Sequence, residues 1–216
     1  MHSSEPAARF ESVFRSDSWQ RDNFLARLFG IFSEHVVTTW CDCPHAPYVN
    51  IGRPTLREPG QSHGHTLDFT LRHRQSGRLY AAEMKCWITW ANYRYLRLTE
   101  AAQLIGLAEP AFVKFLALAR DRAARQVFVG GKPVHVDGAI LVWGAATEPG
   151  RSAAVALGVA DVLTVEDMVS DLHVWQPPGW QDFIARRRSW ATELFDYLGQ
   201  SGCSVQVETT STIIAA

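Results

Sequence analysis

The sequence predicts a mixed α/β fold in which helices flank a central mixed β-sheet. Two adjacent strand patterns, 66–73 and 79–87, are joined by the turn-forming sequence Arg-Gln-Ser-Gly and predict a hairpin. The segment 138–144 is almost continuously apolar, which is typical of a strand covered on both faces. Apolar residues at helical spacing predict a helix before these strands, at 17–37, and another after them, at 180–198.

The remaining elements are predicted from prolines, glycines and short apolar runs. Pro44 and Pro47 interrupt the chain after the first helix, and a short strand at 48–51 precedes a Gly/Pro-rich loop that reaches His65. Pro110 is expected to separate two helices. The expected elements after the hairpin are helices at 93–108 and 110–125, a strand at 161–165 and a short helix at 166–172.

Length and composition fit one globular domain. Hydrophobic residues make up 47% of the chain and charged residues 20%, which is an ordinary balance. We expect a single domain over 1–200 with its core at about 17–165, and a tail at 201–216 that has no evident packing partner. The net charge of −1 argues against an extended basic surface that coats DNA, but it leaves room for a local basic cleft.

The sequence also predicts where the protein resides. No apolar run approaches the roughly 18 residues that a membrane helix needs, and the start of the chain lacks the apolar core of a signal peptide. Four cysteines do not make a disulfide framework in a chain of this length, and they fit a reducing compartment. We therefore expect a cytoplasmic protein with no membrane partner.

The predicted hairpin brings two acidic residues together. A turn between residues 75 and 76, or centred on Ser76, pairs positions whose numbers sum to about 151 or 152, so Asp68 lies opposite Glu83 or its neighbour. Directly opposed residues have Cβ atoms roughly 4.5–5.5 Å apart. Two ionised carboxylates at that distance repel each other unless a cation lies between them. Carboxylate oxygens are ligands that Mg²⁺ prefers, so we expect Mg²⁺ here, with Mn²⁺ as a substitute.

Strand alternation places a lysine beside this acidic pair. Glu83, Lys85 and Trp87 share one face of the second strand with Ala81, and Glu83 and Lys85 lie roughly 7 Å apart along it. The lysine could orient or deprotonate the attacking water and offset charge in the transition state. A solvent-exposed Glu/Lys ion pair is the alternative interpretation, but Met84 and Cys86 on the other face predict a strand that is covered on both sides.

This Asp…Glu-x-Lys pattern, after an opening helix, resembles the PD-(D/E)xK nuclease superfamily, the restriction-endonuclease-like fold. The resemblance covers about residues 17–165. It implies that Asp68 and Glu83 are metal ligands, that the carbonyl of Met84 is a backbone ligand, and that Lys85 is the catalytic lysine. The sequence departs from the family pattern at Leu67, where the motif has proline.

Two further residues are implied by the resemblance alone. Glu34 resembles the additional glutamate that many members place near the metal, although an ion pair with Arg27 on the helix surface explains it equally well. Gln103 resembles a glutamine that some branches carry in the following helix, and an ordinary helix residue is the alternative.

Arginines near the hairpin are the candidate contacts to nucleic acid. Arg72 lies in its first strand, while Arg94 and Arg97 share one side of the expected helix, with Tyr93 and Tyr95 between and beside them. Such mixtures suit phosphate and base contacts, and a solvated helix face explains them almost as well.

The sequence contains one alternative metal cluster. Cys41, Cys43 and His45, together with His63 and His65, could in principle assemble a zinc site. However, the spacing of the two cysteines is shorter than that of zinc knuckles, and no second cysteine pair completes the set.

Together these patterns predict a Mg²⁺-dependent nuclease, with a DNA endonuclease favoured over an RNA enzyme. A single site cuts one strand, so double-strand cleavage would need a homodimer or a larger assembly. The alternative is a catalytically inactive nuclease-fold module that binds nucleic acid or a protein partner. A hydrolase of another phosphodiester remains a third interpretation.

Overall fold

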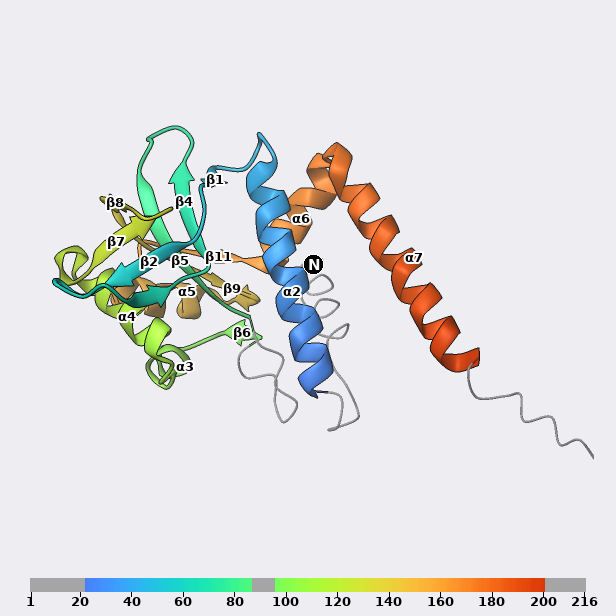
Figure 1. Cartoon of the computed structure of the whole chain (residues 1–216), viewed down its shortest axis with the longest axis horizontal. Helices are drawn as coiled ribbons and strands as arrows, with labels where there is room; N and C mark the ends of the chain where they lie inside the picture. The colour runs from blue at the N-terminus through green and yellow to red at the C-terminus, as the bar shows by residue number, and fades with distance from the viewer. Residues whose placement is uncertain (1–21, 87–95, 201–216) are drawn as a thin grey trace, which may run out of the picture. The chain divides into compact units, whose positions relative to one another are not determined.

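The computed structural model of the chain describes residues 22–86 and 96–200 (Figure 1). The chain divides into two compact units, Met1–Trp175 and Gln176–Ala216. The described part of the second unit is formed mainly by the helix α7 (Pro178–Gln200). None of the described helices combines the length and the apolarity that a membrane crossing requires.

The first unit is built around a mixed five-stranded sheet in the order β1-β4-β5-β9-β11. Neighbours among β1, β4 and β5 are antiparallel, whereas β5, β9 and β11 run parallel. This confirms the expected mixed α/β fold. The strands are β1 (Tyr48–Asn50), β4 (Phe69–His73), β5 (Leu79–Lys85), β9 (Gly138–Trp143) and β11 (Asp161–Thr164).

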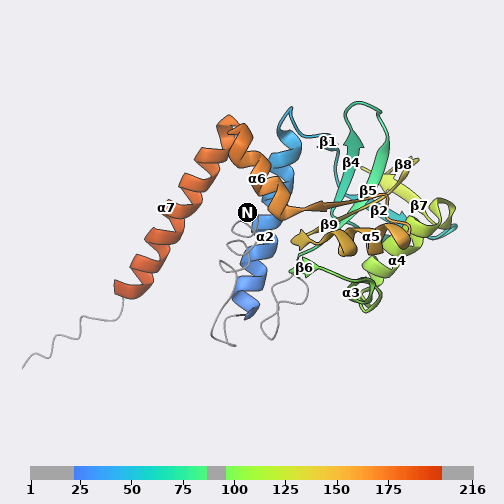
Figure 2. The same cartoon turned by 180° about the vertical axis from the view of Figure 1, so that it is seen from behind.

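Helices cover both faces of this sheet. On one face α2 packs beside α6, where the indole N–H of Trp40 donates a hydrogen bond of 2.8 Å to Asp171 (Figure 1). On the other face α3, α4 and α5 share an apolar cluster with the sheet that includes Phe112 and Leu141 (Figure 2). β9 is therefore buried along its whole length, as its apolar sequence predicts. The helices are α2 (Asp22–Asp42), α3 (Ala101–Ile105), α4 (Pro110–Arg120), α5 (Glu148–Ala156) and α6 (Val165–Trp175).

A second, antiparallel sheet in the order β3-β2-β7-β8 was not predicted from the sequence. Its strands have only three or four residues each, too few to show an alternating pattern. The turn between β7 and β8 uses Gly130 and Gly131 at φ values of 57° and 78°, which favour glycine. The strands are β2 (Pro54–Arg57), β3 (Gly64–Thr66), β7 (Gln126–Val129) and β8 (Lys132–Val134).

The predicted strand at 66–73 is wrong in its first part. The chain leaves the second sheet after Thr66 and joins the central sheet at Phe69, so Leu67 and Asp68 connect the two sheets. The amide N–H of Leu67 donates to the carbonyl of Pro54, which fixes this crossing. As a result Asp68 sits just ahead of β4 rather than inside a strand.

Three predicted helices also need correction. The helix expected at 17–37 continues to Asp42, because Trp40 and Cys41 extend its buried side; residues 17–21 lie outside the described part. Within the helix expected at 93–108, residues 93–95 lie outside the described part, and a short strand precedes α3. The helix expected at 110–125 ends at Arg120. The additional short elements are β6 (Arg97–Leu98), which pairs with β10 (Ala145–Ala146), and the 3₁₀ helix at Arg122–Ala124.

The close approach of α5 to β6 yields a stability prediction. A Cβ added to Gly150 would lie 2.6 Å from the carbonyl carbon of Leu98 and closer still to its oxygen. Gly150→Ala is therefore expected to destabilise the protein by about 2 kcal/mol in urea unfolding, although alanine normally stabilises a helix interior. Gly30→Ala in α2, where no atom lies within 4 Å of an added Cβ, is the matched control and should be neutral or stabilising. Equal stability of the two variants would contradict this packing.

Candidate active site

The hairpin places Asp68 beside Glu83, as predicted. Phe69 pairs with Ala82, so paired residue numbers sum to 151, and the same register continued by one residue sets Asp68 opposite Glu83. The amide N–H of Met84 donates a hydrogen bond of 2.8 Å to Asp68 Oδ2. This bond holds the carboxylate of Asp68 against β5.

Glu83 is a buried acid with one oxygen left over. Glu83 is 3% exposed, and its Oε1 accepts a hydrogen bond of 2.7 Å from Lys85 Nζ. Oε2 is buried and has no hydrogen-bond partner among the described residues. Burial, reinforced by the charge of Asp68, raises the pKa of Glu83 to about 7 against the opposing effect of Lys85. A buried, unsatisfied carboxylate oxygen next to a second acid fits the donor set of a divalent cation.

Lys85 lies between two acids. Besides Glu83, its Nζ contacts Glu109 Oε2 at 3.0 Å, and it lies 5.8 Å from the centre of the Phe112 ring. Burial alone would lower the pKa of Lys85, but Glu83 and Glu109 outweigh it, so the net shift is upward. Lys85 therefore remains a cation at neutral pH.

Glu109 and Arg53 belong to this neighbourhood and were missed by the sequence reasoning. Glu109 is the N-cap residue of α4, ahead of Pro110, and nothing in the sequence pairs that loop with β5. Arg53 contacts Asp68 Oδ1 at 3.4 Å, and its side chain is 61% exposed. Both residues reach the site through the tertiary fold, so spacing along the chain does not indicate them.

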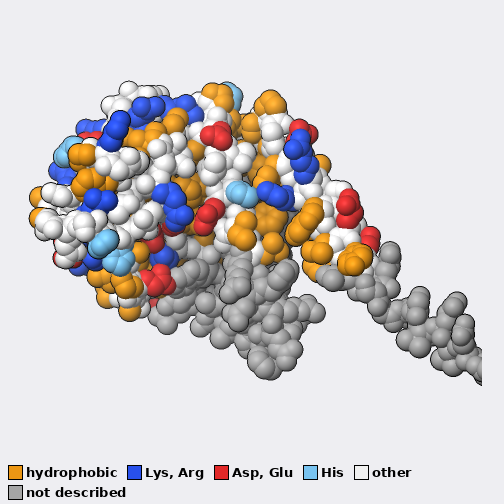
Figure 3. Space-filling view, viewed as in Figure 1, with side chains coloured by type: hydrophobic (Ala, Val, Ile, Leu, Met, Phe, Trp, Pro, Cys, Tyr) orange, Lys and Arg blue, Asp and Glu red, His pale blue; other side chains and the backbone are white. Residues whose placement is uncertain are grey.

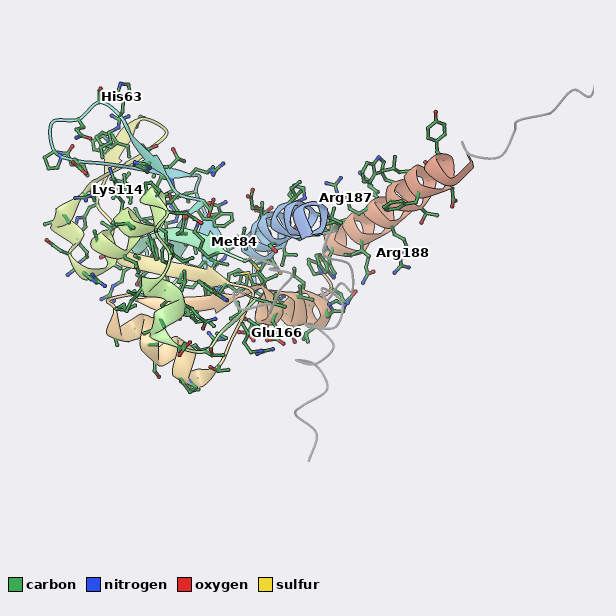
Figure 4. The ribbon with its side chains drawn as sticks, turned by 90° about the horizontal axis from the view of Figure 1, so that it is seen from below. His63, Met84, Lys114, Glu166, Arg187 and Arg188 are labelled. Atoms are coloured by element: carbon green, nitrogen blue, oxygen red, sulfur yellow. The ribbon has the colours of Figure 1, made fainter. Side chains whose placement is uncertain are left out.

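The backbone of Met84, a residue of β5 that is labelled in Figure 4, is the next group of the site. In a strand the N–H and C=O of one residue point toward the same neighbour. Because the N–H of Met84 points to Asp68, its carbonyl also points to the side of β5 on which Asp68 lies. This orientation is the one that a backbone metal ligand between Asp68 and Glu83 requires.

Glu34 is placed apart from these acids. It is exposed on α2, and the adjacent Ser33 bonds to Cys86 Sγ at 3.7 Å, which shows that α2 packs on the sheet face opposite Glu83 and Lys85. Within residues 22–86 and 96–200, no three His, Cys, Asp or Glu side chains gather as a metal-binding group. The structure thus brings Asp68 and Glu83 together without Glu34.

Gln103 has a local role at the start of α3. It is 2% exposed, its Oε1 accepts hydrogen bonds from the N–H groups of Thr99 and Glu100, and its Nε2 donates to the carbonyl of Arg97. Together with Glu100 it forms a capping box. A direct contact of Gln103 with nucleic acid would require this cap to open.

The arginines predicted to contact nucleic acid are dispersed. Arg72 is exposed on β4 but lies four residues, roughly 13 Å, along the strand from Asp68. Arg97 lies in β6 and pairs with Glu166 at 3.6 Å, the residue labelled beside α6 in Figure 4. Arg94 lies outside the described residues. Arg53 is the described arginine that directly contacts one of the paired acids.

The cysteine-histidine alternative does not assemble in the described part of the chain. Cys41 and Cys43 are buried free thiols at the end of α2, whereas His65 lies in β3 of the second sheet. Burial, with a smaller contribution from Asp42, raises the pKa of the Cys41 thiol to about 12. The carbonyls of both cysteines accept hydrogen bonds from Arg74, which joins this segment to the hairpin.

Comparisons with protein-family models, with curated proteins and with solved structures found no match to this chain.

The raised pKa of Glu83 predicts how stability depends on pH without metal. Between pH 4.5 and about 7 the unfolded chain has ionised this carboxyl while the folded chain still holds the proton. The free energy of unfolding should therefore fall as pH rises through this window, owing to this group, and Glu83→Gln should remove that slope. Urea unfolding in chelator at several pH values measures it.

Glu58→Gln is the matched control for this experiment. Glu58 is another glutamate, and it pairs with Lys114 and Arg125 near the surface. This variant should keep the wild-type slope. A slope that survives Glu83→Gln unchanged would contradict the burial of an ionisable carboxyl at position 83.

Proposed function

We propose that this protein is a metal-dependent nuclease, with DNA as the expected substrate, whose site is formed by Asp68, Glu83 and Lys85. The observation that carries the proposal is the buried Oε2 of Glu83, which has no hydrogen-bond partner among the described residues and belongs to an acid held opposite Asp68. A structural ion pair alone would leave this oxygen unsatisfied at a cost of about 1–3 kcal/mol. A divalent cation would satisfy it.

The arrangement of the first unit supports a restriction-endonuclease-like core. A helix precedes the antiparallel strands β1, β4 and β5, and helices then lead to β9, which runs parallel to β5. The acids and the lysine lie on β5 and directly ahead of β4. This order agrees with the one implied by the resemblance to the PD-(D/E)xK superfamily.

Asp68, Glu83 and the carbonyl of Met84 are the groups that would hold the ion. A divalent cation bound there would supply Lewis-acid polarisation of the phosphate and a more acidic water. The N–H of Met84 orients Asp68 by its hydrogen bond, and Lys85 orients Glu83. The ligands are thus positioned before a substrate arrives.

Lys85 and Arg53 supply the positive charge of the proposed site. Because its pKa is raised, Lys85 stays protonated, and we assign it stabilisation of the charge that develops on phosphate rather than proton abstraction. The exposed guanidinium of Arg53 at the rim of Asp68 suits a contact to the nucleic-acid backbone.

Cleavage of supercoiled DNA tests the proposal. The wild type should nick it with Mg²⁺ or Mn²⁺ and not in chelator, while Asp68→Asn and Glu83→Gln should be slower by about a hundredfold or more, because each removes a metal ligand. Glu58→Gln is the control and should cleave normally. RNA and a small phosphodiester are assayed in parallel to identify the substrate class. A folded wild type that leaves all of these intact with either ion would refute the proposal.

The variant Lys85→Met separates metal binding from chemistry. Removing a cation beside the ligands should leave Mn²⁺ affinity, measured by calorimetry, unchanged or tighter, while cleavage falls by about a hundredfold. A parallel loss of Mn²⁺ binding and cleavage would instead show that Lys85 only holds Glu83 in place.

A second candidate function is a nuclease-fold module that binds without cleaving. It is favoured by the ion pairs of Lys85 with Glu83 and Glu109, which already compensate much of the buried charge without metal. This candidate predicts DNA binding that is unaffected by Asp68→Asn and by chelator, measured by fluorescence anisotropy.

A further inference from the structure

α7 carries an apolar face that includes the exposed aromatic side chains of Trp190 and Tyr197 and the half-buried ring of Phe183. Phe183, Trp190, Leu194 and Tyr197 recur at spacings that place them on one side of the helix. Trp190 is 60% exposed and Tyr197 69% exposed. Exposed aromatic clusters of this kind typically mark contact surfaces. This face is therefore suited to a binding partner.

The charges of α7 are distributed unevenly along its length. Its first half holds Asp182 and a run of three arginines, and its second half holds only acidic charged residues (Figure 3). Arg187 lies within the apolar face, 5.4 Å over the ring of Phe183, and projects from a different side of the helix than Arg188 (Figure 4). The charged residues of α7 are Asp182, Arg186, Arg187 and Arg188 in the first half, and Glu193 and Asp196 in the second.

We propose that this face binds α7 of a second copy of the chain, with the two helices antiparallel and centred near Trp190. Arg186 and Glu193 are two turns apart and lie along the same edge of the apolar face. In the antiparallel arrangement Arg186 of each copy lies opposite Glu193 of the other. Two-fold symmetry repeats this contact, so the dimer contains two such ion pairs. A parallel arrangement would place the arginine runs against each other.

The same register also matches the apolar side chains. With Trp190 at the two-fold axis, each Trp190 meets its counterpart, and Phe183 of one copy meets Tyr197 of the other. The charged residues and the apolar residues of this face therefore both match those of a second copy in the same antiparallel arrangement. An anionic membrane or an acidic partner would use the arginines but would give Glu193 no favourable contact. This pattern favours a second copy, and it does not depend on the proposed nuclease activity.

Charge reversal on the full-length chain tests the pairing. Sedimentation velocity should show a concentration-dependent dimer for the wild type. Glu193→Arg and Arg186→Glu should each weaken dimerisation by about tenfold or more, because each places like charges opposite one another twice. Asp196→Arg makes the same charge change as Glu193→Arg, but on the side of α7 opposite Arg187, and should dimerise normally.

Mixing the two weakened variants gives the decisive measurement. Arg186→Glu and Glu193→Arg restore both opposite-charge pairs only when one of each forms a heterodimer, so the mixture should regain the wild-type dissociation constant. Circular dichroism confirms that each variant stays helical. The proposal is overturned by a monomeric wild type, with or without binding to phosphatidylglycerol vesicles. A dimer insensitive to Glu193→Arg, or a mixture that stays monomeric, overturns it as well.

Discussion

The buried carboxylate of Glu83 is the constraint on which the proposed site depends. One of its oxygens is bound by Lys85, the other has no hydrogen-bond partner among the described residues, and Asp68 is held opposite it by the N–H of Met84. Lys85 in turn is held from the far side by Glu109. Glu83 and Glu109 share Lys85, and Arg53 contacts Asp68, so three acids and two cations lie together at the end of β5. Binding of a cation, or of a polyanion together with its counterions, would explain why acids are buried here.

The local part of this site could be predicted from the sequence, because a hairpin is a short-range structure. The turn chemistry after β4 determined the register to within one residue, and that register alone set Asp68 opposite Glu83. The apolar segment of β9 likewise identified a strand covered on both faces. In both cases the information lies within about twenty consecutive residues.

The parts that were missed depend on contacts between distant segments. The second sheet is assembled from strands of three or four residues, so its pairing is decided by tertiary packing rather than by periodicity. Glu109 and Arg53 reach the acids from separate loops, and no spacing rule connects them. The structure gives Gln103 a local role, because its amide group caps the start of α3; a contact of this residue with nucleic acid stays a prediction.

The burial of Glu83 has an evolutionary consequence. Its neighbour on β9 is Leu141, and the opposing side of that apolar cluster comes from Phe112 of α4; neither residue carries any chemistry. Yet these side chains exclude water from the carboxyl and so set its proton affinity. Substitutions that loosen this packing would let the acid ionise more readily and so lower the pKa of Glu83. The proton affinity of Glu83 can thus be changed by drift in the hydrophobic core, while the residues of the proposed site stay the same.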